Sequence, residues 1–474
     1  MSVTLLSAAR ASALATQALR IGNRAVRVRE RGEGPSRVSV GVPVVGNLLA
    51  FAGDRLWLLQ QMAAAPSGIC EAVMIKRPAV FVSTPELAHE VLVTQADAFV
   101  KGTTYELLRP MVGRGLLTSE REVHKKQRRL IAPSFAARRV ASYADVMASL
   151  TERAQRGWAD GSRIDITDEM MKLTLAVVSK TLLDADTSAD SERVSDAVSH
   201  LVRDVNQRMT VPMPPLRWPT PGNQRTRAAL RTLDDIIYRI IAERRRDGTD
   251  HGDLLSMLLE AREEGGGGGM DDQQLRDEVM TIFLAGHETT ATGLSWSFYL
   301  LARHPQIYAK LREQAQSVLG GRAPTFADLP KLGYAMQVFK EAMRMYPPAY
   351  AIGRLATRDV MLGGVRVAAG TDVVVNTVGM HHNPRFFPDP ERFDPERFEP
   401  SAEKQLPRGA YIPFGGGTRV CVGNHFALME GQIILADLAQ RVELSLVSAA
   451  PVEPDPMVTL RPHGEVPMTV RRLR

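Results

Sequence analysis

Cysteine is scarce in this chain: only two occur among 474 residues, Cys70 and Cys421. Two cysteines so far apart cannot form the paired framework of a small secreted domain, and we expect a reducing, intracellular compartment. Aromatic residues are also few, at 6%, and they are not interleaved with basic residues, which argues against a nucleic-acid-binding surface. The net charge of +6 is modest for a chain of this length.

Long apolar runs are missing as well. The longest uncharged runs within residues 1–29 have nine residues, and residues 38–53 are interrupted by Gly41, Pro43 and Gly46. A bilayer-spanning helix needs about 20 apolar residues, so we predict no transmembrane anchor. Residues 1–29 carry five Arg and no acidic residue, which leaves two interpretations open. We favour a solvated N-terminal extension of a bacterial protein over a mitochondrial transit peptide.

The hydrophobic pattern predicts a mainly α fold with small β-sheets. Helical periodicity dominates from about residue 122 to 260, broken by the proline-rich stretch 211–221, and it is longest at 271–303, which contains no proline. Further helices are predicted at 85 onwards, 333–346 and 424–442, and short strands at 71–74, 79–83, 360–375 and in the last 30 residues. We expect an N-terminal extension, 1–37, followed by one domain, 38–474.

The most informative segment runs from Phe414 to Gly423 and reads Phe-Gly-Gly-Gly-Thr-Arg-Val-Cys-Val-Gly. Glycines allow a close approach of the backbone to a flat cofactor, and amide donors at a helix start favour a thiolate at Cys421. Arg419 is suitably placed to meet a carboxylate of the same cofactor. The alternative from the residues alone is a buried structural cysteine.

The spacing Phe-x-x-Gly-x-Arg-x-Cys-x-Gly resembles the haem-ligand loop of the cytochrome P-450 family and matches it at every fixed position. The resemblance implies haem b with an axial thiolate from Cys421, which is the metal ligand. It also implies that the haem lies between the long central helix and the helix after the cysteine.

A second motif, Ala285-Gly-His-Glu-Thr-Thr, falls in the middle of the longest helical pattern. Gly and Thr both cost helix stability there, which is understandable if the helix passes over a cofactor. Ala285 and Gly286 would leave room for dioxygen and substrate. Glu288 and Thr289 resemble the family's acid–alcohol pair, the catalytic residues that relay protons to dioxygen. A helix packing notch with a solvated Glu is the alternative.

A third motif, Glu341-Ala-Met-Arg344, places an acid and a base on one helix face. In the family this pair is buried and joined by an arginine of a Pro-Glu-Arg-Phe segment. That tetrapeptide occurs twice here, and we choose Arg397 because the segment 393–398 matches the longer family pattern. The triad is expected to be structural, and the alternative is an ordinary surface pair.

The resemblance carries further residues over to this chain. The expected haem contacts are His124, Arg128, Ala285, Gly286, Arg354, Phe414, Arg419, Cys421, Gly423 and Ala427. The expected substrate-pocket residues are Thr281, Ala285, Ala349, Tyr350 and Ile352, with walls from the loop 100–118, the region 211–221 and the turn near Pro456. Four histidines, His287, His381, His382 and His425, do not have the spacing of a zinc site.

Taken as a member of this family, the chain is expected to be a haem-thiolate monooxygenase acting on a fatty acid, terpenoid, steroid or polyketide. Only 53 residues follow Cys421, so we expect electrons from a separate ferredoxin or flavodoxin with its NAD(P)H-dependent reductase. We expect a cytoplasmic monomer. Two alternatives stay open: a non-catalytic haem-thiolate binding or sensor protein, and a peroxide-driven relative.

Overall fold

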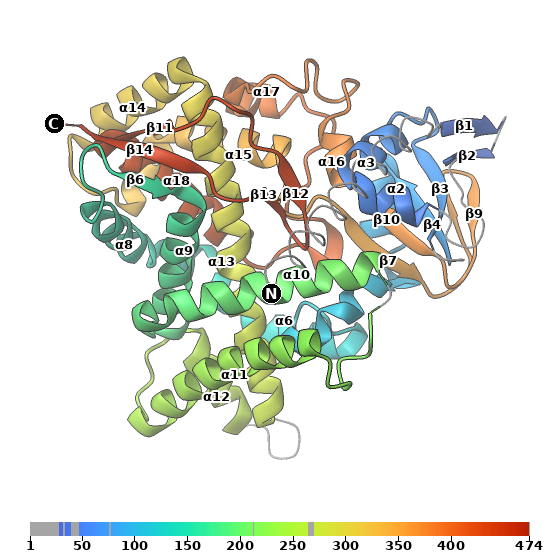
Figure 1. Cartoon of the computed structure of the whole chain (residues 1–474), viewed down its shortest axis with the longest axis horizontal. Helices are drawn as coiled ribbons and strands as arrows, with labels where there is room; N and C mark the ends of the chain where they lie inside the picture. The colour runs from blue at the N-terminus through green and yellow to red at the C-terminus, as the bar shows by residue number, and fades with distance from the viewer. Residues whose placement is uncertain are drawn as a thin grey trace, which may run out of the picture.

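The computed structural model describes residues 28–31, 34–38, 47–74, 77–211, 213–263 and 270–473. Most of these residues belong to helices, and the largest sheet lies at one end of the molecule (Figure 1). The predicted mainly α fold with small sheets is confirmed. Residues 1–27, which include most of the arginine-rich segment, and the glycine run 265–269 lie outside the described residues.

The helices make up the body of the molecule. The longer ones are α3 (Arg55–Ala63), α6 (Arg121–Ile131), α8 (Ala144–Arg156), α9 (Ile166–Leu183), α10 (Ser191–Thr210), α11 (Pro221–Asp247), α12 (Leu254–Glu263), α13 (Asp272–Arg303), α14 (Pro305–Leu319), α15 (Gly333–Met345) and α18 (Asn424–Arg441). The shorter ones are α2 (Leu48–Gly53), α4 (Pro85–His89), α5 (Arg109–Val112), α7 (Ala137–Ala141), α16 (Thr377–His381) and α17 (Pro400–Glu403). The helices predicted at 85 onwards, 333–346 and 424–442 are confirmed as α4, α15 and α18.

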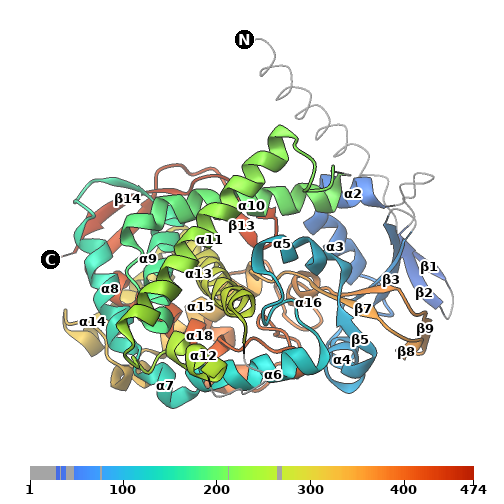
Figure 2. The same cartoon turned by 90° about the horizontal axis from the view of Figure 1, so that it is seen from below.

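Helix α13 passes through the middle of the molecule (Figures 1 and 2) and is buried over most of its 32 residues. Its start is capped by Asp271, whose carboxylate accepts a hydrogen bond from the Gln274 amide at 2.7 Å. No proline interrupts it, and the next helix begins at Pro305 directly after the turn at His304. The helix predicted at 271–303 is therefore confirmed almost to the residue.

Two glycines allow α13, α15 and α18 to approach one another closely. A Cβ atom at Gly431 of α18 would lie 2.4 Å from a ring carbon of Phe339, and one at Gly293 of α13 would lie 3.0 Å from the same ring. The Phe339 ring of α15 therefore occupies space that any other residue at these positions would fill. We call this arrangement the Phe339 wedge.

The largest sheet joins strands from distant parts of the chain. Its order is β1 (Val28–Arg31), β2 (Gly34–Val38), β3 (Ile69–Met74), β4 (Arg77–Val82), β10 (Asp372–Val375), β7 (Ile352–Ala356) and β5 (Phe99–Lys101). The predicted hairpin is confirmed as β3–β4. Residues 34–37, which we assigned to an N-terminal extension, belong to this sheet, because β2 pairs with β3. The parallel pairing of β4 with β10 was not predicted.

Three smaller sheets occur in the part of the chain that the structure describes. They consist of β11 (Val442–Leu446), β14 (Pro467–Arg472) and β6 (Arg163–Asp165); of β12 (Pro454–Pro456) with β13 (Leu460–Pro462); and of β8 (Val360–Leu362) with β9 (Val365–Val367). The strands predicted at 360–375 and in the last 30 residues are confirmed. Within the described part of the chain, none of the helices has both the length and the apolar character that crossing a membrane requires.

Candidate active site

Cys421 lies in the loop before α18, and packing against a neighbouring turn explains one glycine of that loop. Helix α4 continues as a π-helical turn, Glu90–Thr94. Gly417 has φ +65°, and a Cβ atom there would lie 1.9 Å from the carbonyl oxygen of Leu92. Only glycine fits this position. The sequence analysis assigned the loop's glycines to the cofactor, whereas at Gly417 the constraint comes from the protein itself.

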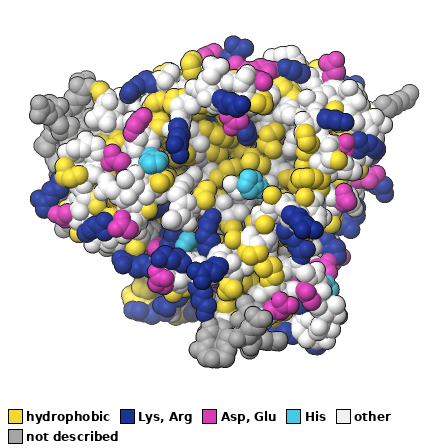
Figure 3. Space-filling model, turned by 180° about the vertical axis from the view of Figure 1, so that it is seen from behind, with side chains coloured by type: hydrophobic (Ala, Val, Ile, Leu, Met, Phe, Trp, Pro, Cys, Tyr) yellow, Lys and Arg dark blue, Asp and Glu magenta, His cyan; other side chains and the backbone are white. Residues whose placement is uncertain are grey.

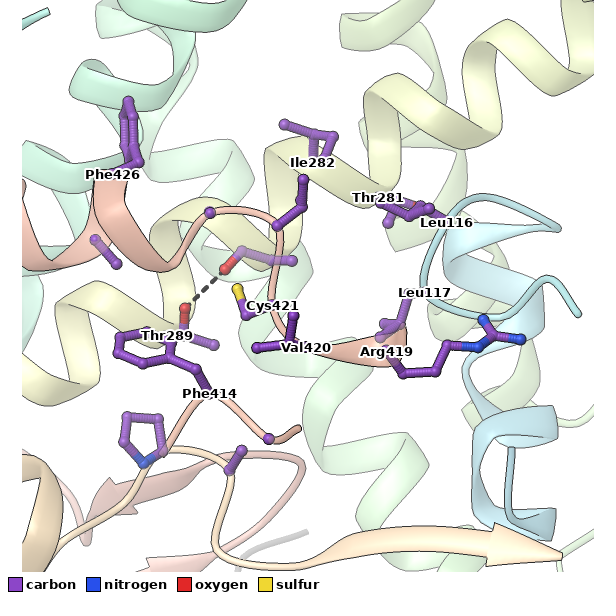
Figure 4. Close-up of a pocket in the computed structure, with 18 of the residues that line it drawn as sticks. Leu116, Leu117, Thr281, Ile282, Thr289, Phe414, Arg419, Val420, Cys421 and Phe426 are labelled. Carbon is purple, nitrogen blue, oxygen red and sulfur yellow. Dashed lines mark hydrogen bonds between the residues drawn. The ribbon is translucent and has the colours of Figure 1, made fainter. Parts of the chain in front are cut away.

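A cavity of about 300 Å³ lies between the Cys421 loop and α13 (Figure 4). Cys421 borders it from one side, and Ala285 and Thr289 border it from α13. Much of the remaining lining is hydrophobic: Leu116, Leu117, Val178, Leu182, Ile282, Phe339, Met343, Ile352, Phe414, Val420, Val422, Phe426 and Ala427. The cavity is therefore suited to an apolar molecule next to a thiol group.

Five basic side chains also line this cavity: Lys101, His124, Arg128, Arg354 and Arg419. Arg128 Nη1 donates to the Val420 carbonyl at 2.7 Å, and Arg419 Nη1 donates to the Ser119 carbonyl at 2.7 Å. Arg419 also forms an ion pair with Glu120. Among the residues that the structure describes, no carboxylate forms an ion pair with Lys101, Arg128 or Arg354. The cavity thus holds an excess of positive charge.

Lys101 was predicted only as part of the pocket-wall loop 100–118 and not as a basic group of the haem site, and tertiary pairing explains why. Strand β5 pairs with β7 so that Lys101 is the direct cross-strand partner of Arg354. Like charges facing each other across two strands repel. Burial, followed by the charges of Arg354 and Arg419, lowers the pKa of Lys101 to about 7. No local sequence signal identifies Lys101, because it enters the cavity only through the pairing of β5 with a strand some 250 residues away.

Thr289 and Glu288 are neighbours in α13 but face different surroundings. The Thr289 hydroxyl lines the cavity and donates to the Ala285 carbonyl at 2.8 Å, as the dashed line in Figure 4 shows. Glu288 does not line the cavity, and its carboxylate accepts a hydrogen bond from the Thr459 hydroxyl at 2.7 Å. It also pairs with Arg461 at 3.0 Å. The structure therefore places only the alcohol of this pair at the cavity surface.

Glu341, Arg344 and Arg397 meet as the sequence analysis predicted. The side chains of Glu341 and Arg344 are 0% exposed, and the two carboxylate oxygens accept from Nε and Nη2 at 2.7 and 2.9 Å. Arg397 Nε lies 3.4 Å from Glu341 Oε1. Arg344 further donates to the carbonyls of His381 and Pro390. The triad thus joins α15 to the segments that precede the Cys421 loop.

Comparison with known proteins agrees with this geometry. The sequence model of the family described as Cytochrome P450 matches residues 36–466. The chain belongs to the cytochrome P450 family. This match covers almost the whole described chain, including the Cys421 loop, the cavity and the triad.

Named relatives and a solved structure support the same assignment. Cyclooctat-9-en-7-ol 5-monooxygenase from Streptomyces melanosporofaciens is 38% identical, covering 85% of this chain and 88% of its own. Cyclooctatin synthase from the same species is 36% identical, with 89% and 92% covered. Pentalenene oxygenase from Streptomyces avermitilis is 34% identical, with 88% and 93% covered.

The crystal structure of the cytochrome P450DA heme domain superimposes with a TM-score of 0.83 at 26% identity, covering 92% of this chain and 97% of that one. Together with the named oxygenases, this identifies the protein as a cytochrome P450 monooxygenase. The two alternatives that we left open, a sensor and a peroxide-driven relative, gain no support from these comparisons.

The cytochrome P450 family implies a haem held by a cysteine thiolate, and the residues of the cavity fit such a group. A haem carries two carboxylates, whose charges would offset most of the positive charge of Lys101, Arg128 and Arg354. Burial and the charges of Arg419, Arg128 and Lys101 lower the pKa of His124 to about 3, so His124 itself adds no charge near neutral pH. The apolar lining and the nearby sulfur of Cys421 suit the porphyrin face and the iron.

The thiol group of Cys421 shows how far the protein alone favours a thiolate. Burial raises its pKa, while the Gly423 amide and the charges of Arg128 and Lys101 lower it by a smaller amount. From the sequence we expected the loop amides to favour a thiolate. Coordination to a metal ion would remove the proton of the thiol.

Most of the predicted pocket residues of this cytochrome P450 line the cavity, but some do not. Thr281, Ala285, Ala349 and Ile352 line it, as do Lys101, Tyr105, Leu116 and Leu117 of the loop 100–118. Tyr350 does not, because its hydroxyl bonds the Met457 carbonyl at 2.8 Å and accepts from Arg55 at 2.8 Å. The described residues of the region 211–221 and the turn at Pro456 also lie outside the cavity lining.

The glycine at position 286 has a different physical explanation from the one that we expected. We expected the missing side chain to leave room for dioxygen. A Cβ atom at Gly286 would lie 2.5 Å from Val178 Cγ2 of α9. Gly286 borders the cavity, but its lack of a side chain serves the packing of α13 against α9.

A second cavity, of about 540 Å³, lies beside the first and shares Tyr105 with it. Tyr350, Met457 and Val458 line this second cavity. Tyr350, which we expected in the first cavity, therefore lies in the neighbouring one.

Proposed function

We propose that this cytochrome P450 monooxygenase inserts one oxygen atom from dioxygen into a neutral, lipophilic terpenoid. Three named relatives, at 34–38% identity, carry names that connect them with the terpenoids cyclooctatin and pentalenene. The observation that carries the proposal to this chain is that neither cavity offers a cation without an acceptor outside the proposed haem contacts. The carboxylate of Asp372, which lines the second cavity, accepts two hydrogen bonds from Thr103.

The polar groups that could anchor a substrate are already paired. The Thr281 hydroxyl donates to the Val112 carbonyl at 3.4 Å, and the Tyr350 hydroxyl is held by Met457 and Arg55. In the second cavity, Arg208 is the one cation among the lining residues. A buried polar group that already has partners gains little from a new one. This favours substrates bound by apolar contact.

The pairing of Arg208 argues specifically against a fatty acid. Its Nε donates to Asp204 at 2.7 Å, Nη1 donates to the Pro214 carbonyl at 3.0 Å, and Nη2 donates to Asn223 at 2.6 Å. All three nitrogens therefore have an acceptor, and Asp204 already balances the charge. A substrate carboxylate would have to displace these contacts, whereas a neutral terpenoid needs none of them.

The proposed roles of the residues follow from their places. Haem b would be held by Cys421, its carboxylates by Lys101, His124, Arg128, Arg354 and Arg419, and its faces by Ala285, Gly286, Phe414, Gly423 and Ala427. A haem with an axial thiolate supplies the activation of dioxygen. Thr289 would hold a proton at its hydroxyl oxygen on the cavity surface. Glu288 would supply an acidic group just behind Thr289. To reach the cavity, its side chain would have to change rotamer and leave Arg461.

The absorption spectrum of the haem gives a test of the proposal, because a substrate that displaces a water ligand from the haem iron shifts this spectrum. The haem-loaded full chain should show this shift on titration with pentalenene or cyclooctat-9-en-7-ol. Lauric acid, a fatty acid, should give no shift at the same concentrations, because no free cation is available to its carboxylate. A shift with lauric acid and none with either terpenoid would overturn the assignment of substrate class.

We further propose that a separate ferredoxin or flavodoxin supplies the electrons at the face formed by α6. His124 and Gln127 of this helix are buried, whereas Lys125, Lys126 and Arg129 are exposed. Figure 2 places α6 at the edge of the molecule that faces the viewer in Figure 3, where Lys and Arg side chains gather below the centre. Small ferredoxins and flavodoxins are generally acidic, so charge would steer their docking.

Replacing Lys125, Lys126 and Arg129 together with Glu should slow reduction by an acidic carrier about tenfold or more, because steering is lost. The rate should be measured by stopped-flow mixing at low and high salt, and salt should matter less for the variant. Ligand binding should be unchanged. A matched control replaces Arg366, exposed but on the hairpin β8–β9, with Glu. Equal slowing in the control, or loss of haem from the triple variant, would contradict the docking face.

The proposed setting is the bacterial cytoplasm, where the chain would act as a monomer. The named relatives come from Streptomyces, and neither cysteine forms a disulfide in the structure.

A further inference from the structure

The loop between α5 and α6, residues 113–119, packs against the first half of α13 with no space to spare. A Cβ atom at Gly113 would lie 2.0 Å from the Asp277 carboxylate. One at Gly115 would lie 2.2 Å from Thr281 Oγ1 and 2.5 Å from the Asp277 carbonyl oxygen. Two glycines in three residues thus bring the loop backbone into direct contact with α13. We call this segment the 113–119 loop.

Two carboxylates of α13 hold the 113–119 loop by its backbone amides. Asp277 Oδ2 accepts from the Arg114 amide at 2.7 Å, and Glu278 Oε2 accepts from the Leu116 amide at 2.9 Å. Hydrogen bonds to an ionised acceptor are among the stronger ones in proteins. Neither carboxylate lines the cavity or belongs to the haem contacts.

Asp277 is fixed from its other side, whereas Glu278 is not. Arg276 pairs with Asp277 at 3.0 Å and also with Asp234 of α11. Glu278 is 0% exposed, and its Oε1 is buried without a hydrogen-bond partner among the described residues. A buried carboxylate with one unpaired oxygen is costly, so its position needs a compensating role.

Opposing effects act on the pKa of the Glu278 carboxyl group. Burial raises its pKa to about 7; the hydrogen bond from the Leu116 amide and the nearby polar side chain of Gln274 lower it, and the negative charge of Asp277 raises it. Either form of the group keeps an oxygen that can accept from the Leu116 amide. A side chain without that oxygen would leave the amide unsatisfied.

We propose that Glu278 is a positioning residue that sets the width of the active-site cavity, because it holds the 113–119 loop against α13. Leu116 and Leu117 of this loop line the cavity, and Figure 4 shows Leu116 next to Thr281 of α13 and Leu117 next to Arg419. If the Leu116 amide is released from Glu278, the side chains of Leu116 and Leu117 move relative to the part of the cavity next to Cys421. Glu278 thereby selects ligands by size without touching them. This inference rests on the proposed haem site.

The test compares ligands of two sizes on the haem-loaded full chain. Imidazole is small and reports on the iron alone, whereas 4-phenylimidazole also fills the cavity. In Glu278→Met the affinity for 4-phenylimidazole should fall about tenfold, because a hydrogen bond to the loop is lost. Imidazole should bind within about twofold of the wild type. Exchange of the Leu116 amide with deuterium should also become about tenfold faster or more.

Two variants separate positioning from general destabilisation. Glu278→Gln keeps the acceptor and should restore both affinities and the slow exchange to within about twofold. Ser295→Ala, on the same helix, removes a buried hydroxyl that bonds only the Ala291 carbonyl, at 2.7 Å, and should change nothing. Equal losses for both azoles in Glu278→Met, or no loss for either, would overturn the proposal.

A second perturbation keeps the test decisive if Glu278→Met fails to fold. Gly115→Ala leaves both carboxylates in place but drives a methyl group into Thr281 and Asp277. It should reproduce the selective loss of 4-phenylimidazole, and unchanged binding of both azoles would count against the inference. If imidazole does not bind even to the wild type, the haem site itself is wrong, which is a different failure from that of the loop.

Discussion

Replacing Cys421 with His is expected to abolish hydroxylation while the protein still folds. The side chain borders the cavity and is exposed there, so the change affects mainly the group that would hold the haem. A histidine ligand lacks the electron-donating thiolate on which oxygen activation depends. The ferrous carbonyl spectrum should move to that of a histidine-ligated haem, and product formation should fall to the background level.

The matched control is Cys70→Ala, because Cys70 is the other thiol in the sequence. Cys70 is buried in β3, away from the cavity lining, and its loss should leave the carbonyl spectrum unchanged. A spectrum that stays the same in the Cys421 variant but changes in the Cys70 variant would assign the ligand to Cys70.

Glu341→Ala and Arg344→Ala are expected to fail at folding, with loss of haem. Each change leaves the other charge buried without its partner, because both side chains are 0% exposed. Breaking a buried pair from one side costs about 3–5 kcal/mol, a large fraction of the stability of a typical domain. Arg344→Ala should be the more damaging, because it also strands the carbonyls of His381 and Pro390. Haem occupancy and the free energy of unfolding in urea measure the effect.

Arg366→Ala provides the comparison for an exposed pair. Arg366 pairs with Asp359 on the surface of β8–β9, where water solvates both charges, and its loss should leave haem occupancy and stability unchanged. If the variants of Glu341 and Arg344 behave like this control, with full haem occupancy, the triad has no role in the stability of the haem site.

Features encoded by neighbouring residues were predicted well from the sequence. Helix α13 was placed almost to the residue, because a cap at Asp271 and a proline after its last turn mark its ends. The position of Cys421 before α18 and the pairing of Glu341 with Arg344 also depend on short segments. Arg397, which we chose because the segment 393–398 matches the longer family pattern, lies 3.4 Å from Glu341.

Features created by contacts between distant segments were missed or misplaced. Lys101 enters the cavity only because β5 pairs with β7, and no pattern around Lys101 indicates that pairing. Tyr350 comes shortly after the predicted helix 333–346, but its hydroxyl accepts a hydrogen bond from Arg55, 295 residues away, and its side chain lies outside the first cavity. The role of Gly286 depends on Val178 of another helix. In each case a tertiary contact decides where the side chain points.

The Phe339 wedge has a consequence for how this protein can acquire new substrates. With Gly293 on one side of the ring and Gly431 on the other, the spacing between the helix that carries Thr289 and the helix that follows Cys421 cannot adapt by small steps. A larger residue at Gly431 demands a simultaneous change at Phe339, and one at Gly293 would press against the same ring. Variation in the family around this core should therefore occur in coupled sets, whereas single substitutions that reshape the cavity should accumulate on its opposite, loop-built wall.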